Sequence, residues 1–155
     1  MVSASDFSLR SATEEDLEFL LALQEHFYAG ENYPYDIAVA RRATLQLLRE
    51  PEFGRVWLAI HHEQPVGYLI LTFAYSIEFH GLDAFVDELY MEPSARGFGL
   101  GNKALALAEQ ACIELNIHYL HLEVERRKVS LQEMYRKYGF KENNRFLMTK
   151  ALPFK

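Results

Sequence analysis

The sequence predicts an α/β fold of the α+β type, in which helices cover both faces of one mixed sheet. Its 155 residues suffice for one core but not for two, so residues 1–155 are expected to form a single domain. Two β-prone runs, 55–61 and 65–75, are separated by three residues, which predicts an antiparallel hairpin. A strand, a long helix and another strand over 84–124 form a βαβ unit, whose two strands are parallel.

The first third of the chain predicts one strand and two helices. Residues 7–10 alternate apolar and polar side chains, as a short strand does. Thr13 precedes three acidic residues and suits the N-cap of a helix that we expect to end at Gly30. Asp36 suits the N-cap of a second amphipathic helix, which runs to residue 50 and is ended by Pro51.

The remainder predicts strands alternating with two helices. Strands are expected at 55–61, 65–75, 84–91, 118–124, 140–142 and 145–150, and helices at 99–115 and 130–138. Gly139 is expected to end the second of these helices, and Asn143-Asn144 to form the turn of a closing hairpin. The expected order is therefore β-α-α-β-β-β-α-β-α-β-β.

Composition narrows the classes of function. A formal net charge of −6 argues against a nucleic-acid-binding protein, which needs a basic face. The single cysteine, Cys112, excludes an internal disulfide, and the histidines show no metal-ligand spacing, so we expect no metal. The sequence has no apolar run of membrane-spanning length, and residues 1–6 lack the pattern of a signal peptide, so we expect no membrane partner and a cytoplasmic location.

A glycine-rich loop follows the predicted strand 84–91. It reads Arg96-Gly97-Phe98-Gly99-Leu100-Gly101 and opens directly into a helix, so backbone N–H groups and the positive end of the helix dipole converge on one anion site. The spacing is not that of a P-loop, since Ala104 stands where the hydroxyl residue is needed. A dinucleotide fingerprint is matched at two glycines and stays open, although Asn102 takes the third position and little chain follows.

Together with the preceding Leu89-Tyr90-Met91-Glu92-Pro93, this loop resembles the GNAT superfamily of acyl-CoA-dependent N-acyltransferases. The resemblance extends over nearly the whole chain, because residues 122–140, with Tyr135 and Gly139-Phe140, are similar to the second conserved segment of that family. The run 86–91 is similar to polyamine acetyltransferases, and Glu123 matches a catalytic Glu of protein N-terminal acetyltransferases. The resemblance implies a GNAT-like fold in which the parallel strand pair splays apart.

It also implies acetyl-CoA as the co-substrate. The family's pyrophosphate loop corresponds to the glycine loop, and the backbone of Leu89 and Met91 is expected to pair with the pantetheine arm. Lys128 stands where the family often has Asn, and can reach a phosphate. The implied cofactor-binding residues are Leu89, Tyr90, Met91, Arg96, Gly97, Phe98, Gly99, Leu100, Gly101, Asn102 and Lys128.

Acetyl transfer to an amine by direct attack needs a base for the amine and an acid for the leaving thiolate. The resemblance makes Tyr135 the acid. Glu88 and Glu123 rank level as the base, with Asp87 below them and a water chain to any of them also possible. Strand alternation predicts that Asp87 and Glu88 point to opposite faces, so only one faces the amine. Cys112 is expected to be a structural thiol.

The acceptor is expected beside the loop 30–35 and the segment 75–80, where Glu78 and His80 lie. The expected substrate-binding residues are Tyr28, Glu31, Tyr33, Tyr35 and Asp87. These residue types suit an amine cation. The sequence thus predicts an acetyl-CoA-dependent N-acetyltransferase acting on a small cationic or peptide amine, and a homodimer is common among similar proteins. The alternative is a non-catalytic acyl-CoA-binding sensor of the same fold.

Overall fold

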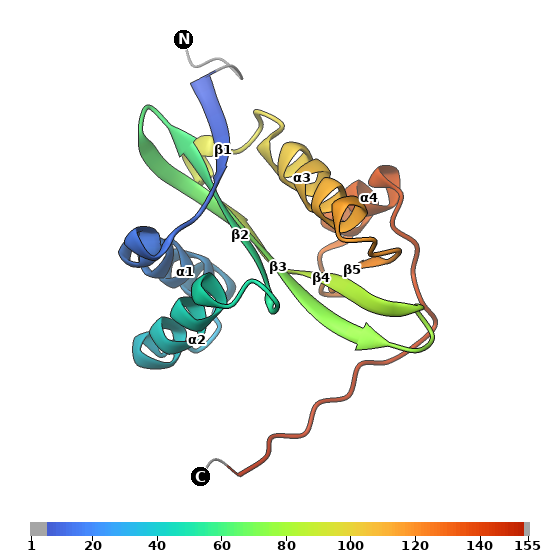
Figure 1. Cartoon of the computed structure of the whole chain (residues 1–155). Coiled ribbons are helices and arrows are strands. Elements are labelled where there is room, and N and C mark those ends of the chain that lie inside the picture. The colour runs from blue at the N-terminus through green and yellow to red at the C-terminus, as the bar shows by residue number, and fades with distance from the viewer. Residues whose placement is uncertain (1–5, 154–155) are drawn as a thin grey trace. The chain divides into compact units, whose positions relative to one another are not determined.

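The computed structural model describes residues 6–153 (Figure 1). The chain divides into two compact units, one ending at Glu123 and one beginning at Val124, and each is described by itself. The elements of the first unit are β1 (Phe7–Ser11), η2 (Glu14–Asp16), α1 (Leu17–Glu31), α2 (Ile37–Arg49), β2 (Gly54–His61), β3 (Gln64–Ser76), β4 (Gly81–Met91), η3 (Pro93–Ala95), α3 (Leu100–Glu114) and β5 (Leu120–Leu122).

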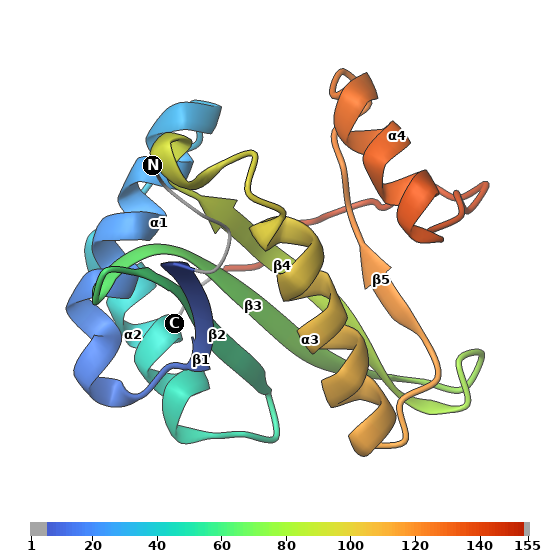
Figure 2. The ribbon, with the colours of Figure 1, turned by 90° about the horizontal axis from the view of Figure 1, so that it is seen from above.

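The first unit is built on a five-stranded sheet in the order β1-β2-β3-β4-β5. Every neighbouring pair is antiparallel except β4–β5, which is parallel from Ala84–Leu120 to Val86–Leu122. Figures 1 and 2 show α1 and α2 on one face of the sheet and α3 on the other. The mixed sheet, the hairpin and the βαβ unit predicted from sequence are confirmed.

Each face of the sheet is covered by a different kind of helix surface. Side chains of α1 and of the sheet together form a core of large residues: Leu20, Leu23, Val56, Leu58, Tyr68, Ile70 and Tyr90. On the other face α3 buries a stripe of mostly small residues that includes Ala104, Ala108 and Cys112. Small side chains let a helix approach a sheet closely, and α3 contacts β4.

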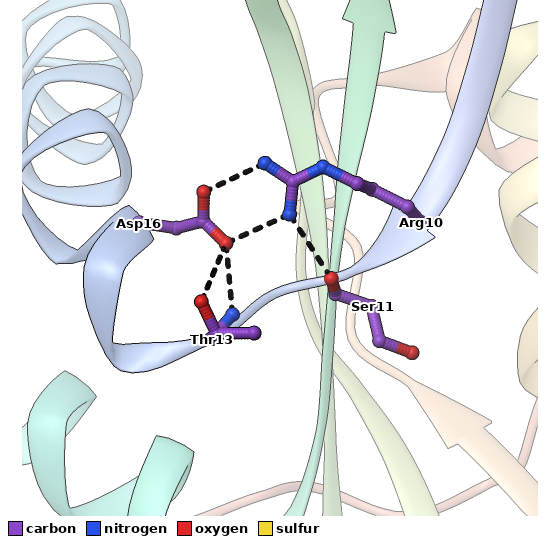
Figure 3. A network of polar contacts seen from close by, with 4 residues as sticks. All are labelled: Arg10, Ser11, Thr13 and Asp16. Atoms are coloured by element: carbon purple, nitrogen blue, oxygen red, sulfur yellow. Dashed lines mark hydrogen bonds and ion pairs between the residues drawn. The ribbon is translucent and has the colours of Figure 1, made fainter.

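A buried carboxylate joins β1 to the start of the first helix (Figure 3). Asp16 is 5% exposed and accepts two hydrogen bonds from the Arg10 guanidinium, at 2.8 and 2.7 Å. It also accepts the backbone N–H of Thr13 at 2.8 Å, which completes a capping box. The arginine hydrogen bonds lower the pKa of Asp16 and outweigh the effect of burial.

The helix boundaries correct one prediction. Helix α1 continues through Gly30 and ends at Glu31, because Asn32 adopts the left-handed conformation at φ 57° and closes the helix with its own N–H. Asparagine tolerates this conformation better than most residues. The Asp36 cap is confirmed, since its side chain accepts the N–H groups of Ala38 and Val39.

The second unit contains α4 (Val129–Tyr138), which ends as predicted at Gly139 with φ 113°. The hairpin expected over 140–142 and 145–150 is wrong, because residues 139–153 contain no strand. Asn143-Asn144 can supply a turn, but a two-stranded ribbon is marginal in water without a third strand or a helix to cover it. The side chains of Phe146, Leu147 and Met148 are exposed.

Across residues 6–153, none of the helices has the length and apolar character needed to cross a membrane.

Candidate functional site

Two tyrosines hold the carboxylate of Glu88. Tyr28 on α1 donates to one carboxylate oxygen at 2.6 Å, and Tyr68 on β3 donates to the other at 2.8 Å. Tyr68 is fully buried. Burial raises the pKa of Glu88 above its ordinary value, the two phenols partly oppose that shift, and the neighbouring Asp87 charge adds to it. A partly desolvated carboxylate with two oriented hydrogen-bond donors is a candidate for proton transfer.

A β-bulge brings Asp87 to the same side as Glu88. The β3–β4 register passes from Ile70–Glu88 to Leu71–Val86, so Asp87 is an extra residue with no partner on β3. Both side chains line one cavity. The prediction that they point to opposite faces is therefore wrong, because a bulge interrupts the alternation on which it rested. Asp87 is open to the cavity, and its partial desolvation raises its pKa.

The cavity has a volume of about 810 Å³. It lies between α1, α2 and strands β3 and β4 of the first unit. It is lined by Gln24, Tyr28, Pro34, Tyr35, Asp36, Val39, Ala40, Ala43, Thr44, Gln46, Leu47, Phe53, Ile70, Thr72, Phe73, Asp87 and Glu88. Tyr28, Tyr35 and Asp87 were predicted for the substrate side and do line it, whereas Glu31 and Tyr33 do not.

The edge of β4 beyond Val86 is left open by the short parallel pairing. The N–H of Glu92 donates to the Val66 carbonyl at 2.8 Å, on the β3 side. Backbone groups alternate along a strand, so those of Leu89 and Met91 face away from β3 and those of Tyr90 face toward it. Pairing with β5 ends at Val86, which confirms the predicted splay. The Met91 carbonyl on this edge already accepts Nε of Arg96 at 2.9 Å.

The glycine loop opens toward solvent at the end of the same strand. Gly97 and Gly99 have φ values of 84° and 77°, which side chains rarely tolerate. A Cβ atom at Gly97, Gly99 or Gly101 would meet no heavy atom within 4 Å, so there is space beside the loop. The first N–H groups of α3, at Leu100, Gly101 and Asn102, lack intrahelical acceptors and point there. These features fit a bound pyrophosphate.

Two side chains of the loop are fixed against the sheet. Phe98 packs its ring 5.0 Å from that of Phe7 on β1. Arg96 lies over the Tyr90 ring at 5.8 Å, and the Tyr90 hydroxyl donates to Glu92 at 3.1 Å. Glu92 also contacts Nδ1 of His26 on α1 at 2.5 Å. These contacts join the end of β4 to α1 just before the glycine loop begins.

The remaining predicted site residues belong to the last residue of the first unit and to the second unit. Glu123 is exposed and directly follows β5, and Lys128 precedes α4. Tyr135 is a buried residue of α4, packs edge-on against Phe140 at 5.7 Å, and has its pKa raised by burial. The catalytic roles of Tyr135 and Glu123 stay predictions. Burial raises the pKa of the Cys112 thiol to about 11, as expected of a structural cysteine.

The segment 75–80 does not line the cavity. It contains the turn between β3 and β4, and its rings pack on the β5 side, with Phe79 at 4.9 Å from Tyr119 and 4.4 Å from His121. Glu78 and His80 are therefore not part of this cavity, and their expected place beside the acceptor stays a prediction. A run of polar residues marks a turn, but it does not tell which end of the sheet the turn lies at.

One grouping of potential metal ligands occurs within the described residues. β1–β2 pairing brings Asp6 beside His61 and His62, and the three ligand atoms lie within 4.8 Å of one another. The sequence spacing did not indicate it, since Asp6 is far from the histidine pair along the chain. The His61 ring stacks on Phe7 at 4.2 Å and lies 4.1 Å from the His62 ring. The grouping is not part of the cavity lining.

Sequence inspection missed Tyr68 and the apolar cavity wall. The one available signal for Tyr68 was a phenol within the otherwise apolar run 66–71. Phe53, Phe73 and Leu47 carried no signal, because ordinary core residues have the same character. Their common position depends on how α2 packs against the sheet.

Comparison with known proteins identifies the class of protein. The sequence model described as Acetyltransferase (GNAT) family matches residues 17–140, and the chain belongs to this family. This settles the open interpretation of the glycine loop against a dinucleotide fingerprint. No curated protein matches the chain.

Solved structures share the fold over almost the full length. An integron cassette protein from the mobile metagenome of Cole Harbour Salt Marsh is 33% identical, with a TM-score of 0.85 over 99% of this chain and 95% of that one. A predicted acetyltransferase with acetyl-CoA from Clostridium acetobutylicum is 20% identical, with a TM-score of 0.80 over 93% and 96%. An aminoglycoside N-acetyltransferase in complex with CoA is 14% identical, with a TM-score of 0.80 over 94% of both chains.

Proposed function

We propose that the protein transfers an acetyl group from acetyl-CoA to a primary amine, by direct attack of the amine in a ternary complex. The observation that carries this proposal is the Glu88 carboxylate, held by two phenols at 2.6 and 2.8 Å on the strand that leads into the glycine loop. Strand β4 therefore carries the proposed base and borders the cavity proposed for the amine, and the glycine loop that follows β4 forms the anion site.

The co-substrate would be held by main-chain groups. The N–H groups at the start of α3, with the glycines before them, suit the pyrophosphate. The free N–H groups of Leu89 and Met91 suit the amide-bearing pantetheine arm, and one of them can polarise the thioester carbonyl. Two fold relatives contain acetyl-CoA or CoA, which supports this choice of co-substrate.

Side chains of the protein would then take protons from the amine and give one to the leaving thiolate. The amine enters as an ammonium ion, which the carboxylates of Asp87 and Glu88 attract. Glu88 accepts one proton from the ammonium ion, directly or through a water, and so frees the nitrogen lone pair for attack on the thioester carbon. The nitrogen loses its second proton as the N–C bond forms and the C–S bond breaks. The departing thiolate takes up a proton, for which Tyr135 is the proposed donor. The balance is ammonium ion plus thioester giving amide, free thiol and one proton: one nitrogen proton replaces the proton given to sulfur, and Glu88 releases the other to solvent.

The structure supports Glu88 over Glu123 as the base. Glu88 is half-buried, lines the cavity and is oriented by Tyr28 and Tyr68, whereas Glu123 is exposed at the end of β5. A raised pKa brings Glu88 closer to the working pH, which favours proton transfer in both directions of the catalytic cycle.

The test combines binding with turnover. The protein is titrated with acetyl-CoA, and thiol release is then followed with hexylamine, phenethylamine, spermidine, a short peptide and kanamycin. We expect release with at least one amine. Glu88→Gln should lower kcat by about 100-fold or more, and Glu63→Gln, on the exposed β2–β3 turn, should leave it unchanged. Acetyl-CoA binding without thiol release for any amine would instead support the sensor alternative.

A further inference from the structure

The cavity of the first unit has two chemically different ends. Asp87 and Glu88 form the acidic end on β4. The rest of the wall is largely apolar and comes from α2, β3 and the turn before β2, including Val39, Leu47 and Phe73. A ligand that fits both ends carries one cation joined to an apolar body.

The polar groups of the cavity other than these two carboxylates mostly have protein partners. Gln24 donates to the Thr44 hydroxyl at 3.1 Å, and both residues are buried. The Tyr35 hydroxyl donates to the Leu21 carbonyl at 3.1 Å, and Asp36 accepts the N–H groups that it caps. Satisfied groups gain little from further hydrogen bonds, so the wall offers little to the hydroxyls or second amines of a polar substrate.

The lining residues also include no lysine, arginine or histidine. Arg55 lies over the Phe73 ring at 5.4 Å but donates to the backbone carbonyls of Pro51 and Gly54, and it does not line the cavity. A substrate carboxylate would therefore face three acids, Asp36, Asp87 and Glu88, without a lysine, arginine or histidine of the lining to pair with. A second ammonium group that lies along the wall of Val39, Leu47 and Phe73 would lose its hydration against apolar side chains.

We propose, on the basis of the function proposed above, that the acceptor is a lipophilic primary monoamine, with an alkyl or arylalkyl arm and no carboxylate. The ammonium group lies against Asp87 and Glu88, and the arm extends along the wall formed by Val39, Leu47 and Phe73. The volume of about 810 Å³ leaves room for an arm of many carbon atoms. Each methylene buried should raise kcat/KM by up to about fourfold until the wall is filled.

Three amines of matched length test the proposal. Hexylamine, 1,6-diaminohexane and 6-aminohexanoate share one six-carbon arm and differ only at its far end. We expect kcat/KM for hexylamine to exceed that for each of the others by at least about tenfold, because their charged ends lose hydration in the wall. Equal or better turnover of the diamine or the amino acid would overturn this inference while leaving the N-acetyltransferase function intact.

A direct binding measurement tests the preference for a lipophilic amine separately from the proposed acetyl transfer. Calorimetric titration of the same amines into the protein with CoA present measures affinity without turnover. Tighter binding of hexylamine without thiol release would uphold the lipophilic site and remove the proposed reaction. Equal affinities for the three amines would remove the lipophilic site whether or not thiol is released.

A charge placed in the wall should change the preference. Val39 lines the cavity on α2 and is 49% exposed, so Val39→Glu is compatible with folding. It should raise the ratio of diamine to hexylamine kcat/KM by about fivefold or more, since it gives the second ammonium a partner. Ile37→Glu is the matched control, because Ile37 is 51% exposed on the same helix and does not line the cavity. The same shift in both variants would contradict the placement of the arm.

Discussion

The hydroxyl of Tyr68 lies 2.8 Å from a carboxylate oxygen of Glu88 and donates to it, although twenty residues separate them in the chain. Tyr68 is 0% exposed, so its hydroxyl has no access to bulk water. A buried donor paired with a carboxylate is worth more than an ordinary hydrogen bond and fixes the direction of the carboxylate. The Tyr68–Glu88 hydrogen bond therefore connects the buried core to Glu88, the candidate base.

Tyr68→Phe should move the pH dependence of the reaction. Hydrogen bonds from the phenols lower the pKa of Glu88, so loss of one raises it further. The base form is the ionised one, and the acidic limb of the kcat/KM profile should therefore shift to higher pH. We expect a loss of about tenfold at neutral pH. Tyr119→Phe, outside the cavity lining, should leave the profile in place, and an unmoved limb in Tyr68→Phe would remove Glu88 as the titrating base.

Asp87→Asn should stabilise the protein at neutral pH while reducing activity. The folded-state pKa of Asp87 is raised by desolvation, so the protonated form is favoured in the fold. The Asp87 carboxyl contributes to the free energy of unfolding below its pKa in the unfolded chain. That contribution is lost as the pH rises through its pKa in the folded protein. Because Asp87 is open to solvent, we expect less than about 1 kcal/mol, or roughly 1–3 °C in Tm.

Thermal unfolding at pH 8 and pH 4 tests whether Asp87→Asn raises Tm only where Asp87 is ionised. The gain of Asp87→Asn over the native protein should be present at pH 8 and disappear at pH 4, and Glu63→Gln serves as the exposed control. A gain that is the same at both values would show that ionisation of Asp87 is not its cause.

Gly101→Leu should separate co-substrate binding from stability. Gly101 lies in the first turn of α3 without a positive φ, and a Cβ atom there has open space. Leucine favours a helix over glycine by up to about 1 kcal/mol, so Tm should not fall. The side chain would enter the space proposed for the pyrophosphate, so we expect acetyl-CoA affinity to fall by at least about tenfold, measured by calorimetry.

Gly30→Leu is the control, since a Cβ atom at Gly30 also meets open space, near the end of α1. Unchanged affinity in Gly101→Leu would place the pyrophosphate elsewhere.

Asp16→Asn should destabilise the fold without affecting the site. The two bonds from Arg10 lower the pKa of Asp16, so its ionised form stabilises the fold above the unfolded pKa, and that contribution is lost as the pH falls through the folded value. We expect a loss of about 1–3 kcal/mol at pH 7, measured by urea unfolding, with kcat/KM of the folded protein unchanged. The difference should shrink toward pH 3, and a constant difference would point to packing in place of charge.

The sequence by itself determined the parts of this protein that are built from neighbouring residues. The glycine loop is such a part, because its anion site consists of consecutive backbone groups and a helix start. The Asp36 cap, the end of α4 at Gly139 and the parallel β4–β5 pair follow from local patterns and chain connectivity. The closing hairpin failed for a related reason, since Asn143-Asn144 can specify a turn but cannot supply the neighbours that a strand pair needs.

The tertiary structure alone decided how the cavity and the carboxylates beside it are arranged. The bulge that brings Asp87 beside Glu88 depends on the register between β3 and β4, and alternation along one strand predicted the opposite. The hydrogen bonds from Tyr28 and Tyr68 to Glu88 join α1 and β3 to β4. The apolar wall exists only where α2 covers the sheet. Such contacts form between segments that are far apart in the chain. Their energies depend on the whole fold, so no local sequence pattern predicts them.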